Sequence, residues 1–330
     1  MNALRIAVAG FRHGHIADLV ERARRHGETE IVAAWEPDPA ARQWAEKTLG
    51  IAITHSDLQA LMETDAEIIA VGDVFARRGA IAIAALQCGK HVLLDKPICT
   101  SLAELERIRA LAAEKRRAVG AMLDLRDRPV LREARRQIRA GAIGAVHAVQ
   151  FTGQHPLNYG ARPAWYFQTG MHGGTLNDLG VHGVDAVRWL AGAELEEVRA
   201  ARCWNAFAAE EPDFRDCAQF LAVFGGGMGV MGDVSYSAPS TRYVLEPYWR
   251  FTLWGTDGML EFNLARERLT LCRNGSAQPE FLPAQAAPGS YFEDFIREIR
   301  GEPAELNTRE VLASSQAALR LQAAADAKME

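Results

Sequence analysis

Over the first 122 residues, short apolar runs alternate with amphipathic segments, and this alternation constrains the fold more than any other feature of the chain. Strands that alternate with helices form βαβ units, whose strands lie parallel in one sheet. The apolar runs predict strands near residues 4–9, 31–35, 52–54, 67–71, 91–94 and 118–122, and the segments between them predict helices near 15–26, 39–48, 57–63, 77–88 and 102–116. We therefore expect an α/β domain with a parallel sheet over residues 1–122.

After Met122 the pattern changes to strands joined by short, glycine-bearing turns. One predicted helix near 128–140 is followed by apolar runs at 146–151, 195–206, 215–224, 228–236, 248–254 and 258–263. Strands that follow one another with short turns favour a mainly antiparallel sheet, and hence an α+β domain. We predict that this second domain spans residues 123–287 and that a helical tail runs from about 288 to 330.

Composition limits the classes of partner. At 330 residues the chain is longer than a single core usually grows, which agrees with two domains. Its formal net charge of -5 gives no basic footprint, so no nucleic-acid partner is expected. The five cysteines form no Cys-x-x-Cys pair, which argues against a zinc site and a secreted disulfide framework. No apolar run approaches the roughly 18 residues of a membrane span, and the first run is too short for a signal peptide. We therefore expect a cytoplasmic protein with no membrane partner.

Residues 10–15 follow the first strand and open a helix, as a dinucleotide-binding turn does. Of the three glycines in the G-x-G-x-x-G pattern, Gly10 is present, whereas Arg12 and His15 take the second and third places. The free N–H groups at a helix start favour a pyrophosphate, to which Arg12 would add a charge-assisted contact. Glu36 ends the second strand, where an acid accepts hydrogen bonds from ribose hydroxyls and repels a 2′-phosphate, so NAD is favoured over NADP.

The strand expected at 91–94 runs directly into Asp95-Lys96-Pro97. In open α/β sheets, ligands lie outside the carboxyl ends of the strands, so Lys96 is placed at an expected binding crevice. The alternative is a surface lysine in an ordinary turn.

A second polar pair lies in the segment 173–185, where Asp178 and His182 are four residues apart. If this segment is helical, the two side chains share one face. An imidazole titrates near neutral pH and a nearby carboxylate orients it, which is what the removal of a hydroxyl proton requires while hydride leaves the same carbon. The alternatives are a histidine satisfied inside a packed helix and an Asp185 that bonds to its backbone surroundings.

With these motifs in this order, the chain resembles the Gfo/Idh/MocA family of oxidoreductases over nearly its full length. The family's Glu-Lys-Pro motif corresponds to Asp95-Lys96-Pro97. Its glycine pair, aspartate and histidine correspond to Gly173-Gly174, Asp178 and His182, and its carboxyl-terminal segment to Thr308-Arg309-Glu310 and the alanine-rich stretch that follows.

The resemblance implies a Rossmann-type first domain and a large open sheet in the second, whose open face is buried in a homodimer or homotetramer. It also implies that the tail packs back on the first domain and that the Lys96-Pro97 bond is cis. Hydride would pass between the nicotinamide and a sugar, polyol or related hydroxy compound. Lys96 would contact the nicotinamide ribose and stabilise the substrate alkoxide, His182 would be the general acid/base, and Asp178 would bind substrate. The predicted cofactor-binding residues are Gly10, Phe11, Arg12, His13, Glu36, Gly72, Asp73, Asp95 and Lys96.

The chain departs from the family's pattern in two places, which leave the substrate open. Relatives carry Thr-Pro and then a histidine where this chain has Gly72-Asp73-Val74 and Arg77-Arg78, and an aromatic-Asn-Arg-Arg segment where it has Met122-Leu123-Asp124-Leu125-Arg126. Residues 153–168 are rich in aromatic and polar side chains, which suit a carbohydrate, although a packed loop is the alternative. The predicted substrate contacts are Arg126, His155, Arg162, Trp165 and Tyr166.

Two other functions stay open at this point. The enzyme could use NAD for redox-assisted cleavage of a glycoside or for elimination, or the fold could serve as a non-catalytic cofactor-binding sensor. The histidines and acids match no standard set of metal ligands in their spacing, so no metal site is expected.

Overall fold

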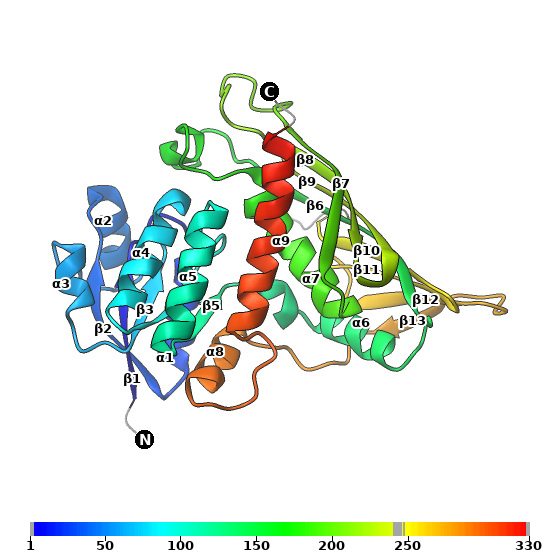
Figure 1. The fold of residues 1–330 in the computed structure, drawn as a ribbon, viewed down its shortest axis with the longest axis horizontal. Coiled ribbons are helices and arrows are strands. Elements are labelled where there is room, and N and C mark those ends of the chain that lie inside the picture. Colours follow the sequence, from blue (N-terminus) through cyan, green and yellow to red (C-terminus); the bar gives the residue numbers. More distant parts are fainter. Residues whose placement is uncertain (1–2, 240–245, 247, 328–330) are drawn as a thin grey trace. The chain divides into compact units, whose positions relative to one another are not determined.

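The structure is a computed structural model that describes residues 3–239, 246 and 248–327. The chain forms two compact units (Figure 1). The first unit contains the residues up to Met122, Gly170–Gly173 and Tyr291–Ser315, and the second contains Leu123–Thr169, Gly174–Ser290 and the residues from Gln316 on. No helix among the described residues has the length and apolar composition that a membrane crossing requires.

The first unit is built on a five-stranded parallel sheet with the strand order β2-β1-β3-β4-β5, which confirms the predicted Rossmann-type sheet. Its strands are β1 (Leu4–Ala9), β2 (Thr29–Trp35), β3 (Ile68–Val71), β4 (His91–Leu94) and β5 (Val119–Ala121). Its helices are α1 (Ile16–Arg25), α2 (Pro39–Lys47), α3 (Leu58–Met62), α4 (Phe75–Gln87), α5 (Leu102–Lys115) and α8 (Tyr291–Ile299). The strand order reverses direction at β1, so the right-handed rule for parallel crossovers puts α1 on one face and α4 and α5 on the other. All four residues of β3 are buried, as expected for a strand covered on both faces.

The strand predicted at 52–54 is wrong, and its failure has a local cause. The N–H of Ala34 on β2 donates to Thr54 Oγ1 at 3.0 Å. In a regular sheet, this N–H would instead donate to a backbone carbonyl of the neighbouring strand. Only a single bridge, between Trp35 and His55, joins this segment to β2. The sheet therefore has five strands instead of six, and Lys96 follows the fourth of them.

The second unit contains an eight-stranded sheet with the order β13-β12-β11-β10-β6-β9-β8-β7. Its strands are β6 (Val146–Pro156), β7 (Leu195–Trp204), β8 (Cys217–Phe224), β9 (Met228–Ala238), β10 (Arg250–Gly255), β11 (Gly258–Asn263), β12 (Arg268–Arg273) and β13 (Glu280–Pro283). Only β6 and β9 pair in parallel, so the predicted large and mainly antiparallel sheet is confirmed. The sequence did not predict β12 or β13.

One face of this sheet is covered and the other is open. Helices α6 (Pro129–Arg139) and α7 (Val181–Ala191) lie against the covered face (Figure 1). Val149, Phe151 and Val230 are buried on that face. Residues that alternate with these point the other way, and Leu221 and Met231, directly opposed on β8 and β9, are 44% and 49% exposed.

The predicted tail divides between the two units, which differs from the expectation that all of it packs on the first domain. In the first unit, the N–H of Val119 donates to Thr308 Oγ1 at 2.8 Å, at the start of α9 (Thr308–Asp326). In the second unit, Gln322 Oε1 accepts the N–H of Leu176 at 3.0 Å. A helix of 19 residues is about 28 Å long, so its two ends reach different partners. Residues 328–330 of the predicted tail lie outside the described residues.

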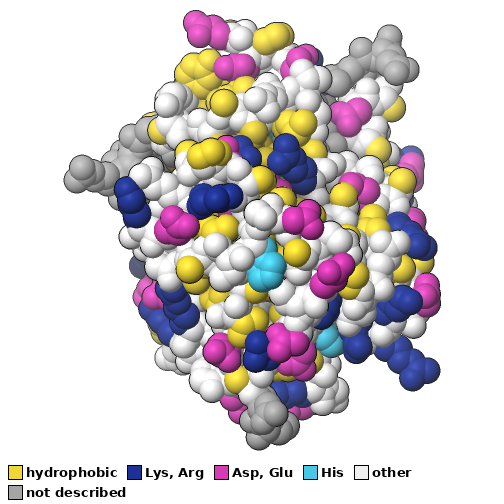
Figure 2. All heavy atoms as spheres, turned by 90° about the vertical axis from the view of Figure 1, so that its left-hand side faces the viewer, with side chains coloured by type: hydrophobic (Ala, Val, Ile, Leu, Met, Phe, Trp, Pro, Cys, Tyr) yellow, Lys and Arg dark blue, Asp and Glu magenta, His cyan; other side chains and the backbone are white. Residues whose placement is uncertain are grey.

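Charges of both signs are interspersed over the face shown in Figure 2. This arrangement agrees with the balance of 37 basic and 42 acidic residues in the sequence.

Candidate functional site

The turn after β1 is fixed tightly against the end of β3. Gly10 has φ +88°, a backbone conformation that side chains rarely adopt, and a Cβ there would lie 2.7 Å from Cβ of Asp73. The N–H groups of Arg12 and His13 both donate to the carbonyl of Gly72, at 2.9 and 3.2 Å. Glycine is therefore required at the one position of the dinucleotide pattern that the chain keeps.

Glu36 braces this turn from the end of β2. Its fully buried carboxylate accepts the N–H of Phe11 at 2.6 Å and that of Asp38 at 2.8 Å. Burial raises the pKa of Glu36, although these two N–H groups oppose the rise. Arg12 lies 3.4 Å from the carboxylate of Asp38, so the guanidinium predicted to contact pyrophosphate is paired with a carboxylate in this structure.

Asp73 supplies an unused acceptor at the same place. It is fully buried, its Oδ1 accepts the N–H of Val74 at 2.6 Å, and its Oδ2 has no hydrogen-bond partner within the described residues. Burial raises the pKa of Asp73. A buried oxygen without a donor is unfavourable, and a ligand hydroxyl would satisfy it. The Gly10 turn and this acceptor together fit a dinucleotide with its ribose hydroxyls.

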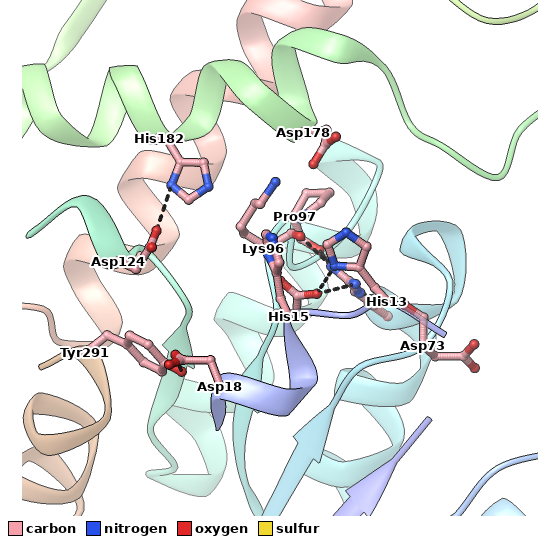
Figure 3. A network of polar contacts seen from close by, with 12 residues as sticks. His13, His15, Asp18, Asp73, Lys96, Pro97, Asp124, Asp178, His182 and Tyr291 are labelled. Carbon is pink, nitrogen blue, oxygen red and sulfur yellow. Dashed lines mark hydrogen bonds and ion pairs between the residues drawn. The ribbon is translucent and has the colours of Figure 1, made fainter. Parts of the chain in front are cut away.

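Asp95, directly after β4, is fully buried and has three basic neighbours, of which Figure 3 labels His13 and His15. Its Oδ2 lies 2.8 Å from Arg78 Nη2 and 2.5 Å from His13 Nδ1, and its Oδ1 lies 3.3 Å from His15 Nδ1. Burial alone would raise the pKa of Asp95, but the permanently charged guanidinium of Arg78 holds it well below its ordinary value. Burial lowers the pKa of His13 to about 4, so at neutral pH His13 is a neutral donor to this carboxylate.

Arg78 ties the end of β3 to the segment after β4. Besides Asp95, the guanidinium donates to the carbonyl oxygens of Asp73 at 2.8 Å, Lys96 at 2.5 Å and Pro97 at 3.3 Å. The Lys96-Pro97 bond is cis, as predicted. The backbone of Lys96 is thus held by the same side chain that neutralises the acid before it.

His13, His15 and Asp95 are also spaced as metal ligands would be, with their ligand atoms within 4.8 Å of one another. Arg78 already balances the charge of Asp95, and a second cation beside that guanidinium would be repelled. That the protein uses no metal stays a prediction.

In the second unit, the segment with Asp178 begins with a π-helical turn, Leu176–Gly180, which runs into α7. Gly174 precedes this turn with φ +92°, and a Cβ there would lie 2.1 Å from Cδ of Gln322. Because Gln322 Oε1 accepts the N–H of Leu176, α9 caps the start of the turn. Gly174 of the motif therefore allows a close approach of α9.

Asp178 is held from the strand side by a tyrosine. Its carboxylate accepts a hydrogen bond from the hydroxyl of Tyr236 on β9. Burial, together with the charge of Asp178, raises the pKa of Tyr236 well above its ordinary value, so the phenol stays a donor. Arg162 lies over the rings of Tyr166 and Tyr236, 4.7 and 5.5 Å from their centroids. The structure thus brings Arg162 and Tyr166 to Asp178 through Tyr236.

His182 has a carboxylate neighbour that sequence reasoning did not predict. Asp124 Oδ1 lies 3.7 Å from its Nδ1 (Figure 3). The imidazole faces Trp249, 5.6 Å between ring centroids, and His155 contacts the same indole at 5.5 Å. His155 is therefore brought to His182 through Trp249.

Two of the predicted substrate residues are held inside the second unit. Arg126 donates from Nε and Nη2 to the two carboxylate oxygens of Asp185, at 2.9 and 2.6 Å, and both side chains are buried. Asp185 therefore pairs with a side chain. Trp165 is buried against Tyr166, with 4.5 Å between ring centroids.

Sequence reasoning did not assign roles to several residues that shape these sites, namely Arg78, Asp124, Tyr236, Trp249 and Gln322. Asp124 follows β5 in the chain as Lys96 follows β4, and this position could have identified Asp124 as a candidate site residue from the sequence. The other four carry no local pattern that separates them from packing residues.

Comparison with known families matches both parts of the chain. Residues 4–122 match the model of an oxidoreductase family with an NAD-binding Rossmann fold. Residues 131–261 match the GFO/IDH/MocA C-terminal domain.

Individual relatives are similar at lower levels of identity. The chain is 26% identical to levoglucosan dehydrogenase of Pseudarthrobacter phenanthrenivorans over 72% of its own length and 65% of the relative's. It is 28% identical to scyllo-inositol 2-dehydrogenase (NAD(+)) of Bacillus subtilis over 72% of its own length and 68% of the relative's. The match to levoglucosan dehydrogenase thus spans just under two thirds of that relative, and the match to a carboxy-chloro-dihydroxycyclohexadiene dehydrogenase of Comamonas testosteroni spans 51%.

Solved structures share the whole fold. A putative oxidoreductase from Erwinia carotovora atroseptica superposes with a TM-score of 0.86 at 23% identity, covering 98% of both chains. A levoglucosan dehydrogenase in complex with NADH and levoglucosan superposes with a TM-score of 0.83 at 19% identity, covering 100% of this chain and 98% of the other.

Proposed function

Because the chain belongs to the GFO/IDH/MocA family of oxidoreductases, we propose that it is an NAD-dependent dehydrogenase of a sugar, polyol or related hydroxy compound. The observation that carries the proposal is the buried network around Asp95. It holds the backbone of Lys96 at the carboxyl end of β4 and reaches the Gly10 turn through His13. A lysine fixed in this way stabilises negative charge that develops on a substrate oxygen.

The nicotinamide cofactor, when bound, supplies the hydride acceptor or donor. In our proposal Asp73 Oδ2 accepts a hydrogen bond from a ribose hydroxyl. The two acids at this site, Glu36 and Asp73, disfavour a 2′-phosphate and so favour NAD over NADP. The proposed cofactor-binding residues are Gly10, Phe11, Arg12, His13, Glu36, Gly72, Asp73, Asp95 and Lys96.

Two residues handle the substrate oxygen in this proposal. Lys96 stabilises the alkoxide, and His182 takes the hydroxyl proton in oxidation and returns it in reduction. The carboxylate of Asp124, 3.7 Å from His182 Nδ1, stabilises the charged imidazole. Asp178, oriented by Tyr236, accepts a hydrogen bond from a substrate hydroxyl.

The substrate class follows from the relatives and from the second unit. The names levoglucosan dehydrogenase and scyllo-inositol 2-dehydrogenase support a sugar or polyol. We propose His155, Arg162 and Tyr166 as specificity residues, because each reaches His182 or Asp178 through one aromatic side chain. Arg126 and Trp165 are not carried into the proposal, because both are committed to internal packing.

The test compares the wild-type protein with Lys96→Met. We expect NADH to bind both proteins, detected by its fluorescence, and a sugar and polyol panel to give NADH formation with the wild type only. The loss in kcat should be about 100-fold or more. Failure of both NADH and NADPH to bind would refute the proposal. Turnover without net NADH formation would instead indicate redox-assisted cleavage, and cofactor binding with no turnover of any compound would indicate a sensor.

We also propose that a second copy of the chain covers the open face of the large sheet. The exposed cross-strand pair Leu221 and Met231 supports this, because an apolar pair on the open face favours burial. Light scattering should show a dimer or tetramer for the wild type and a smaller species for Met231→Glu.

The five cysteines, which form no disulfide, support the cytoplasm as the compartment.

A further inference from the structure

The first unit contains a groove, away from the cofactor turn, that is rich in arginine. Its volume is about 860 Å³, and four of the residues that line it are Arg109, Arg116, Arg117 and Arg309. The volume lies within the range of about 300–1,000 Å³ that small-molecule sites occupy.

The groove lies at the opposite edge of the sheet from the residues proposed to bind NAD. It is lined by His91, the first residue of β4, and by Ala118, the residue before β5. Glu36 and Asp95 instead follow the last residues of β2 and β4. Because all strands of this sheet are parallel, the groove is at their amino ends and is separate from the cofactor turn.

Among the described residues, three of the four guanidinium groups in the groove have no carboxylate partner, whereas Arg109 lies 3.4 Å from the carboxylate of Glu106. Arg116, at the carboxyl end of α5, and Arg309, in the first turn of α9, form no ion pair with any described residue. Arg117 donates from Nε to the carbonyl of Gly89 at 2.5 Å, which fixes its side chain without neutralising it. Two acids line the groove, Glu298 and Glu302. Glu298 already accepts the N–H of Thr308 at 2.8 Å.

The charge of Arg117 acts on a neighbouring side chain in the groove, His91. His91 accepts the N–H of Ala118 on its Nδ1 at 2.9 Å. Burial and then the charge of Arg117 lower the pKa of His91 to about 4, so the imidazole adds no further charge at neutral pH. Like charges gathered in one groove repel one another, and an anion would relieve that repulsion.

We propose that this groove binds a small anion that carries two or more phosphate groups. Phosphate suits the site because the planar fork of a guanidinium donates two parallel hydrogen bonds to phosphate oxygens. Two phosphate groups suit the site because the two unpaired cations, Arg116 and Arg309, come from different elements, the end of α5 and the start of α9. This binding is additional to the cofactor and does not depend on the proposed dehydrogenase activity.

The test uses pyrophosphate as the probe and the full chain in saturating NADH, which keeps pyrophosphate out of the cofactor turn. Calorimetry should detect binding to the wild type. The variant Arg116→Gln with Arg309→Gln should weaken it at least about tenfold, because charge-assisted hydrogen bonds to phosphate are lost at two positions. The matched control, Arg25→Ala with Arg107→Ala, removes the same charge from helix surfaces outside the groove and should keep the wild-type affinity.

Three results would overturn the proposal. They are the absence of pyrophosphate binding, displacement of pyrophosphate by NADH, and an equal loss of affinity in the control, which would reveal attraction to net charge alone. Arg309→Gln by itself provides a milder variant with a loss in the same direction, and thermal unfolding of each variant checks that it is folded.

Discussion

Replacing Arg78 by methionine should destabilise the first unit strongly, because the change leaves several buried groups without a partner. The guanidinium and the carboxylate of Asp95 are both fully buried. Without Arg78, the charge of Asp95 is left to neutral His13 and half-exposed His15, and the carbonyls of Asp73 and Lys96 lose their donor. Methionine fills much of the volume, so the effect measures the lost polar contacts rather than a cavity.

The expected loss is about 3–5 kcal/mol, the cost of removing one partner from a buried ion pair. That is a large part of the roughly 5–15 kcal/mol by which folded proteins are stable. The preceding residue provides the control, because Arg77 is exposed on the same helix. Arg77→Met should change stability by no more than about 0.5 kcal/mol.

The loss should also depend on pH in a definite direction. In the wild type the pKa of Asp95 is depressed, so its contribution to stability is present above the unfolded pKa of about 3.9 and fades only as pH falls through the lower, folded pKa. Without Arg78, burial instead raises the pKa of this carboxyl, which takes up a proton as pH falls. The difference between wild type and variant should therefore be largest at neutral pH and should shrink toward about pH 5.

Hydrogen exchange of the amides in β3 and β4 measures this opening free energy locally, in the unit that contains Arg78. A double-mutant cycle with Asp95→Asn should give a coupling of about 2 kcal/mol or more. The reasoning fails if Arg78→Met and Arg77→Met differ by less than about 1 kcal/mol, if the two changes at 78 and 95 are additive, or if the loss grows as pH falls.

Three further changes test other parts of the two sites. Because burial raises the pKa of Asp73, the charged carboxylate destabilises the folded protein above that pKa. Asp73→Asn should therefore stabilise the protein by about 1 kcal/mol at neutral pH, measured by urea unfolding, and this gain should disappear below about pH 4. The same change should weaken NADH binding. Tyr236→Phe removes the donor to buried Asp178 and should lower stability by about 1.5–3 kcal/mol in thermal unfolding, whereas Tyr159→Phe, at an exposed hydroxyl, should change it little. Gly10→Ala should lower stability by more than about 1 kcal/mol and abolish NADH binding, whereas Gly14→Ala, where a Cβ meets nothing within 4 Å, should do neither.

The fold was predictable wherever a strand or helix carried its own periodicity. The five helices predicted before Met122 all form, with ends shifted by no more than two residues, because their apolar faces mark them. The strand β12 has the same signal, with Leu269 and Leu271 buried on alternate positions, and could have been predicted. The strand β13 could not, because it lies at the sheet edge and leaves Phe281 55% exposed, so no buried face marks it.

The candidate site divides along the same physical line. Glu36 and Lys96 were identifiable because parallel strands deliver the residues after their carboxyl ends to one edge of the sheet. The partners that hold the site come from far along the chain: Tyr236 is 58 residues from Asp178, and Gln322 is 146 from Leu176. Nothing local distinguishes such residues, because their role exists only once the chain has folded.

The departures from the family's pattern around Asp95 are best understood as parts of one buried arrangement. Asp95 is one methylene shorter than the glutamate of the Glu-Lys-Pro motif, and Arg78 is among the longest side chains. Here the long cation reaches the short acid at 2.8 Å, and the same guanidinium bonds the carbonyls of Lys96 and Pro97. Arg78 thus faces inward and acts on Lys96, not on a ligand. Of the unusual residues after β3, it is Asp73, with its unused acceptor beside Gly10, that bears on what the cofactor site holds.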